Sequence, residues 1–222
     1  MPARIRRIVL AIPLLLLVLG AAAPAGSEAA TLYTRDLYFS AGYERQIDSR
    51  TCVAASTAMM MNFIARRDLN LSQRSILAYA QPRDALNNAV QRGSDPLGWA
   101  RAATYYSRHT PRPTTYNWEA YSTESAALKR AATVIARYGK PVGLVVWNGR
   151  HAVVMTGFTS TRNPTRGGSF SVLSVIYSDP LGSRHATISA ANSPLNRYLE
   201  MDATTTYDRL WYGKYIIVAP QN

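Results

Sequence analysis

The sequence predicts an α+β domain in which a helical first half packs against an antiparallel sheet formed by the second half. Segments rich in Ala, Met and Leu, which favour helices, dominate before Pro141. Short runs of Val, Ile, Phe and Tyr, which favour strands, follow it. Asn148-Gly149 stands between the first two of these runs and is typical of a hairpin turn. Helices followed by hairpin-connected strands define the α+β class.

Four helices are expected in the first half, because each apolar segment follows a residue able to cap it. Ser49 or Thr51 precedes a helix that starts at or just before Cys52 and carries two arginines in its last turn, favourable for the helix dipole. The other three are residues 72–80 after Ser72, 96–108 after Asp95 with Pro96 in the first turn, and 124–138 between Thr123 and Gly139-Lys140-Pro141.

The strands are expected at residues 141–147, 151–158 and 169–179, with a last one at 214–220. A polar, Gly-rich loop, residues 160–168, joins the second and third of them. Residues 193–201 predict one more short helix, because Ser193 can cap it and Pro194 follows.

The N-terminus has the composition of a secretory signal peptide. Three arginines precede an apolar run and then the small residues of AAAPAG, so cleavage is expected after Ala25. The apolar run is shorter than the roughly 20 residues that span a bilayer, although an uncleaved anchor remains the alternative. We therefore expect a protein that is secreted, periplasmic or held at the cell envelope, with residues 1–25 as signal and residues 26–222 as a single domain.

The chain is basic, with a net charge of +12 that falls to +9 once residues 1–25 and their three arginines are removed. Such a charge suits an anionic cell-wall or membrane surface, or simply a basic soluble surface. The positive residues are scattered, without the dense basic tract of nucleic-acid modules, so no nucleic-acid partner is expected. No HExxH-type zinc spacing is present, and we expect a monomer without metal or cofactor.

Cys52 is the only cysteine, so it cannot form an internal disulfide. At the amino end of a helix, the dipole and free backbone N–H groups stabilise a thiolate, which favours a nucleophile over a buried bystander. Gln46 stands six positions earlier and offers an amide donor near the Cys52 N–H. Two donors aimed at one point form an oxyanion hole.

A nucleophilic thiol needs an imidazole, and the imidazole needs an orienting group. His151 begins a β-branched strand directly after the hairpin turn, and Asp179 ends the next strand. Adjacent antiparallel strands would bring the two together. His109 lies among prolines, and His185 has no carboxylate close by in sequence.

Gln46 and Cys52 at the head of an Ala/Met helix, followed by GKPVGLVVWNGRHAVVMTGF and VIYSDP, resemble the papain-like cysteine peptidases. Within them the chain is most similar to the branch that removes double-glycine leader peptides from bacteriocins. The resemblance covers roughly residues 40–182. It implies a papain-like fold and a peptide or protein substrate, with Cys52 as nucleophile, His151 as general base and acid, Asp179 as orienting carboxylate and Gln46 as oxyanion donor.

Two features depart from the family. Val53, Ala54 and Ala55 replace the usual Gly-Pro-Ala run after the cysteine, and the separation between His151 and Asp179 is longer than usual. Papain-like clefts place an aromatic residue near the histidine, so Trp147 and the adjacent Asn148 are candidates for the substrate cleft, with simple packing as the alternative for Trp147.

Three functions follow from these residues. The first is a secreted cysteine peptidase that forms an acyl-enzyme. The second is a cell-wall peptide amidase or endopeptidase using the same thiol, disfavoured because the related wall hydrolases orient the first histidine with a second one soon after it, and none occurs between His151 and His185. The third is a binding module that keeps the fold without turnover, which the Val53-Ala54-Ala55 departure suggests.

Overall fold

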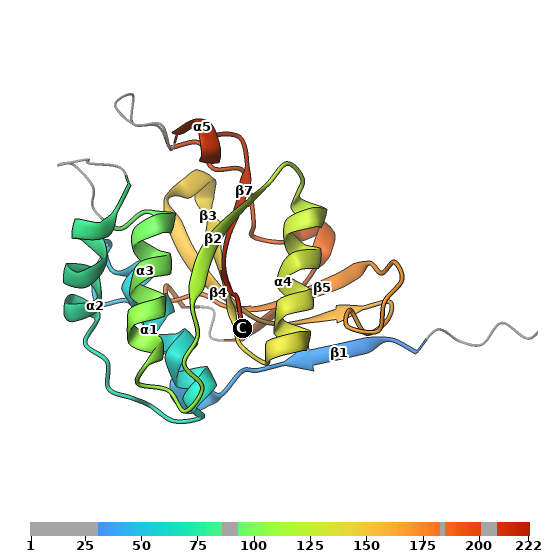
Figure 1. Cartoon of the computed structure of the whole chain (residues 1–222), viewed down its shortest axis with the longest axis horizontal. Helices are drawn as coiled ribbons and strands as arrows, with labels where there is room; N and C mark the ends of the chain where they lie inside the picture. The colour runs from blue at the N-terminus through green and yellow to red at the C-terminus, as the bar shows by residue number, and fades with distance from the viewer. Residues whose placement is uncertain (1–30, 86–92, 183–184, 201–207) are drawn as a thin grey trace, which may run out of the picture.

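The computed structural model describes residues 31–85, 93–182, 185–200 and 208–222. Within these residues, seven strands form one sheet in which every paired neighbour is antiparallel (Figure 1). The order across the sheet is β2-β7-β3-β4-β5-β6, and β1 pairs with β4. The strands are β1 Tyr33–Asp36, β2 Tyr116–Tyr121, β3 Val142–Val146, β4 His151–Ser160, β5 Val172–Ser178, β6 Ala186–Ser189 and β7 Tyr215–Pro220.

Helices cover both faces of this sheet (Figure 1). α1, α2 and α3 pack on one face and α4 on the other. Neighbouring residues of β7 show the division, because Ile216 and Val218 join the first cluster, whereas Ile217 and Ala219 join the second. The helices are α1 Cys52–Ala65, α2 Gln73–Ala80, α3 Pro96–Ser107, α4 Glu124–Tyr138 and the short α5 Asp208–Trp211. The predicted α+β class is confirmed.

Three of the predicted helix starts are confirmed with their caps. The side chains of Ser72, Asp95 and Thr123 each accept a hydrogen bond from the backbone N–H three residues later. α4 also ends as expected, because Gly139 adopts the left-handed conformation at φ 60°.

α1 is buried from Cys52 to Ile64, and this central position fixes the site residues that it carries. Polar side chains inside it find partners: the Ser56 hydroxyl donates to the carbonyl of Ala152 at 3.0 Å and the Thr57 hydroxyl donates to that of Val53 at 2.8 Å. The bond from Ser56 joins α1 to β4 one residue after His151.

The predicted positive charge in the last turn of α1 is wrong. The helix ends at Ala65, and Arg66 is its left-handed C-cap at φ 56°. The Arg66 guanidinium instead donates to the backbone carbonyls of Leu37 and Tyr38. It therefore ties the end of α1 to the segment that follows β1.

The predicted helix at residues 193–201 is also wrong, within its described part. Residues 193–200 run in extended or irregular conformation, and isolated bridges join Leu195 to Val146 and Arg197 to Tyr215. Burial of Leu195 in the cluster around α4 overrides the local helix signals. Four further elements, β1, β2, β6 and α5, are present that the sequence does not predict.

The predicted signal peptide, residues 1–25, lies outside the described residues. Within residues 31–85, 93–182, 185–200 and 208–222, no helix is long and apolar enough to cross a bilayer.

Candidate active site

Cys52 is the first residue of α1 and is 8 % exposed. Thr51 stands at the N-cap but does not cap the helix, contrary to one of the two caps that the sequence suggested. Its hydroxyl donates to the Asp48 carbonyl at 3.1 Å and accepts from the Asp48 N–H at 3.2 Å. No Thr51 side-chain bond satisfies the first N–H groups of α1, so these donors remain at the helix end that carries Cys52 and suit a substrate oxygen.

His151 is the first residue of β4 and is 4 % exposed. It follows the turn of the β3–β4 hairpin and pairs with Val146 across it. The turn spans residues 147–150, and Trp147, Asn148 and Gly149 all take positive φ values in it, at 52°, 59° and 103°. The strand thus fixes the imidazole beside the start of α1.

Asp179 comes directly after β5, and its Oδ1 lies 2.8 Å from Nε2 of His151. The same oxygen accepts the backbone N–H of Leu181 at 2.8 Å. The carbonyl of Asp179 accepts the hydroxyl of Tyr43 at 3.0 Å. With Nε2 occupied by Asp179, Nδ1 is the nitrogen left for the Cys52 thiol, which also hydrogen-bonds the imidazole.

The partners of His151 decide its charge. Burial by itself would lower the pKa of the imidazole, but the hydrogen bonds with Asp179 and Cys52 outweigh it and raise the pKa of His151 to about 9. Burial would raise the pKa of Asp179, but the His151 bond and the Leu181 N–H lower it below its usual range. The site therefore favours an imidazolium between a carboxylate and a sulfur at neutral pH.

Gln46 reaches the same region through the loop before α1. Its backbone N–H donates to the carbonyl of Pro180 at 3.0 Å, next to Asp179, and its side-chain Nε2 donates to the carbonyl of Asp48 at 2.8 Å. A primary amide has two N–H donors, so one remains for a ligand. Its Oε1 is buried and has no hydrogen-bond partner among the described residues.

The model of the Peptidase_C39-like family matches residues 40–206, which is most of the chain and includes all four predicted site residues. The chain belongs to the Peptidase_C39-like family. This membership indicates a cysteine peptidase, and it confirms the predicted relationship to the papain-like C39 peptidases. No curated protein matches the chain.

The C39-like chain places an exposed tryptophan against its histidine. The rings of Trp147 and His151 have centroids 4.4 Å apart, and Trp147 is 53 % exposed. Asn148 is exposed, with its backbone held by the segment 193–200: its N–H donates to Oδ1 of Asn196 at 2.8 Å, and its carbonyl accepts the N–H of Leu199 at 2.9 Å. Both candidate cleft residues thus border the histidine turn.

Three side chains near the site, those of Tyr43, Ser56 and Asn196, are not predicted from the sequence and hydrogen-bond backbone groups there. No local pattern marks such residues, because each contacts a segment distant in sequence. His185 lies outside the site, where its Nε2 is 2.7 Å from Oδ2 of Asp36 and its ring stacks on Tyr38. In the part of the chain that the structure describes, no group of three His, Cys, Asp or Glu side chains could hold a metal ion.

Proposed function

We propose that this chain is an exported cysteine peptidase that hydrolyses a peptide bond through an acyl-enzyme on Cys52. The observation that carries the proposal is the line of three groups formed by the Cys52 thiol, the His151 imidazole and the Asp179 carboxylate, with 2.8 Å between Nε2 and Oδ1. These groups come from the start of a helix and from the ends of two adjacent strands, so their positions are fixed by the fold.

In the first step, the sulfur of Cys52 attacks the carbonyl carbon of the scissile bond and a C–S bond forms. The carbonyl oxygen becomes an oxyanion, for which the N–H of Cys52 and the second N–H of the Gln46 amide are the proposed donors. The His151 imidazolium then gives its proton to the leaving nitrogen as the C–N bond breaks. The amine product departs, and a thioester remains on Cys52.

In the second step, neutral His151 takes a proton from water while the water oxygen attacks the thioester carbon. The same two N–H donors stabilise the second oxyanion. The C–S bond breaks, the carboxylic acid product leaves and gives its remaining proton to solvent, and the sulfur nucleophile and the imidazolium are restored. Asp179 holds Nε2 throughout, so Nδ1 stays aimed at the sulfur.

The orienting group supports a peptidase of this kind over the cell-wall hydrolase alternative. The carboxylate of Asp179 orients His151, whereas a second histidine is the orienting group expected of the related wall enzymes. His185, the next histidine along the chain, pairs with Asp36 instead. Wall peptides remain a substrate class to test beside ordinary peptides.

We further propose that the mature protein begins near Gly26, acts as a monomer of one domain outside the cytoplasm, and binds peptide or protein substrates without a cofactor. The proposal rests on the signal-like N-terminus and the basic composition. N-terminal sequencing of protein recovered from the medium and envelope fractions tests it. An N-terminus near residue 26 supports export, and an intact Met1 in the cytoplasm contradicts it.

Cleavage of a peptide library, read by mass spectrometry, tests the chemistry. Cys52→Ala and His151→Ala should each lower cleavage at least about a thousandfold, as removal of a triad member does elsewhere. His185→Ala is the matched control, because it breaks a second His–Asp pair of similar geometry outside the site. Unchanged cleavage by Cys52→Ala, or equal losses in the two histidine variants, would contradict the mechanism.

A further inference from the structure

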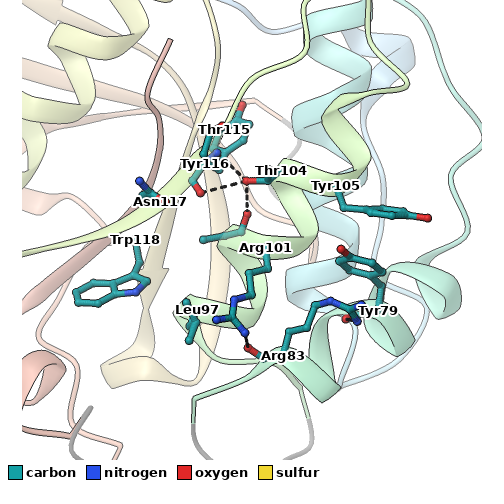
Figure 2. Close-up of a pocket in the computed structure, with 11 residues that line it drawn as sticks. Tyr79, Arg83, Leu97, Arg101, Thr104, Tyr105, Thr115, Tyr116, Asn117 and Trp118 are labelled. Atoms are coloured by element: carbon teal, nitrogen blue, oxygen red, sulfur yellow. Dashed lines mark hydrogen bonds between the residues drawn. The ribbon is translucent and has the colours of Figure 1, made fainter.

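A cavity lies away from the three catalytic groups, between α2, α3 and β2. Its volume is about 760 Å³, within the range of ligand sites. None of the four proposed catalytic residues lines it. Figure 2 shows Trp118 of β2 on one side of this cavity and Tyr79 and Tyr105, from α2 and α3, on the other.

The walls of the cavity are aromatic and rigid. The rings of Tyr79 and Tyr105 stack with centroids 4.0 Å apart. The guanidinium carbon of Arg83 lies 3.7 Å from the centre of the Tyr79 ring, and Nη1 of Arg83 donates to the Tyr79 carbonyl at 2.8 Å. These contacts hold the arginine in one orientation before any ligand arrives.

Two positive charges face this space. Arg101 lines it beside Arg83 and donates from Nη1 to the Arg83 carbonyl at 3.1 Å (Figure 2). Among the described residues, the lining includes no Asp or Glu, and neither guanidinium forms a salt bridge. Each guanidinium has five N–H donors, so several remain to bind a carboxylate in its preferred forked geometry.

The uncharged polar residues that line the cavity lie at or beside an edge strand of the sheet. β2 lies at one edge of the sheet, and Thr115, which precedes the strand, and Asn117, near its start, line the cavity. The hydroxyl of Thr104 in α3 binds the backbone of Tyr116 at the start of β2, because it accepts the Tyr116 N–H and donates to the Tyr116 carbonyl. A ligand here therefore meets aromatic faces, two guanidinium groups and a strand edge with amide and hydroxyl groups.

From this chemistry we propose that the cavity binds an acidic segment of the peptide substrate, with a Glu or Asp carboxylate at Arg83 and Arg101 and a neighbouring apolar side chain between the tyrosines and Trp118. The inference rests on the proposed peptidase function. β2 stands three strand positions from β4, or roughly 14 Å at the usual strand spacing. An extended chain covers about 3.3 Å per residue, so the acidic residue lies at least about four residues from the scissile bond.

Binding to the Cys52→Ala variant tests this site without requiring turnover. The probe is a fluorescein-labelled peptide that alternates Glu with Leu and Phe, compared with its Gln counterpart by fluorescence anisotropy. We expect the Glu peptide to bind at least about tenfold more tightly, and Arg101→Gln or Arg83→Gln to remove most of that preference. Arg74→Gln is the matched control, because Arg74 is exposed on α2 and does not line the cavity.

Equal affinity for the Glu and Gln peptides would overturn the proposal. So would an equal loss of Glu-peptide affinity in Arg74→Gln and Arg101→Gln. A third contradicting result is arginine-dependent binding of free phenylpropionate while the peptide does not bind. Unfolding midpoints of the arginine variants, measured alongside, should equal that of the parent. Selective binding of the Glu peptide to Cys52→Ala supports the binding site even if the wild type cleaves no peptide. The binding assay and the cleavage assay therefore test the cavity and the peptidase mechanism separately.

Discussion

The carboxylate of Asp179 meets Nε2 of His151 at 2.8 Å, although 28 positions separate the two residues in the chain. Because the pKa of Asp179 is lowered, the carboxylate is ionised and acts only as an acceptor, so Nε2–H donates. The pairing of β4 with β5 creates this contact and leaves Nδ1 for the Cys52 thiol. One strand register thereby sets the tautomer of the histidine.

The pH dependence of catalysis should report this contact. The leaving nitrogen needs a proton from the imidazolium, so kcat/KM should fall above a pH of about 9, the raised pKa of His151. Asp179→Asn removes the carboxylate that raises the pKa of His151, while burial still lowers it. The pKa of His151 should therefore fall, the alkaline limb should move to lower pH, and the maximal rate should drop at least about a hundredfold.

The matched control is Asp36→Asn, which removes the carboxylate partner of His185. It should leave the alkaline limb in place. An alkaline limb that stays at the same pH in Asp179→Asn would show that Asp179 does not set the charge of His151.

Trp147 should matter for turnover more than for stability. Its ring covers one side of the His151 imidazole at 4.4 Å while remaining 53 % exposed, so few packing contacts are lost on its removal. Trp147→Ala would admit water to the bond between His151 and Asp179, and we expect kcat/KM to fall about tenfold with little change in the unfolding midpoint. Trp147→Phe should recover most of the activity, and equal rates for the Ala variant and wild type would refute this role.

Gly143 lies in β3 against the buried indole of Trp99. A Cβ added there would stand 2.4 Å from two carbons of the indole, so Gly143→Ala should lower the free energy of unfolding by about 1–3 kcal/mol. Trp99→Phe removes those carbons, and the double variant should be more stable than the sum of the two single losses predicts. Urea unfolding of the four proteins measures this coupling; strict additivity would contradict the clash.

The loop before α3 contains a carboxyl that should make stability depend on pH. Burial and then the neighbouring Asp95 raise the pKa of Asp84 to about 8. The folded chain thus keeps a proton that the unfolded chain loses near pH 4, and the free energy of unfolding falls as pH rises between these values. From pH 5 to 6.5 the decline should be up to about 1 kcal/mol per unit, and Asp84→Asn should flatten it in urea titrations; equal slopes in both proteins would argue against it.

The elements predicted well are those whose signals are local. α4 has its cap at Thr123 and its stop at Gly139, and both lie within one turn of the helix that they bound. β1 shows no such pattern, because three of its four residues are exposed and its strand partner is the far half of β4, distant in sequence. β2 was missed for a similar reason, since Glu119 within it is held by Arg130 of α4.

The site residues also differ in whether a local sequence pattern predicts them. The order of Cys52, His151 and Asp179 along the chain, each at the end of an expected element, was sufficient to nominate them before any geometry was known. The orientation of the Gln46 amide toward Asp48 and the bond from Asn196 to the hairpin depend on loops that no local pattern specifies. The absence of a Thr51 side-chain cap at the start of α1 likewise depends on the loop fold around Asp48.

The most direct test of the catalytic arrangement is covalent labelling of Cys52 by a peptidyl epoxysuccinate probe, followed by intact mass. Opening of the epoxide needs both the sulfur nucleophile and a proton donor beside it, and Cys52 is the single cysteine, so one adduct reports one site. We expect rapid labelling of the wild type and of His185→Ala, with labelling at least about a hundredfold slower in His151→Ala and in denatured protein. Equal labelling rates for His151→Ala and the wild type would show that the thiol does not work with this histidine.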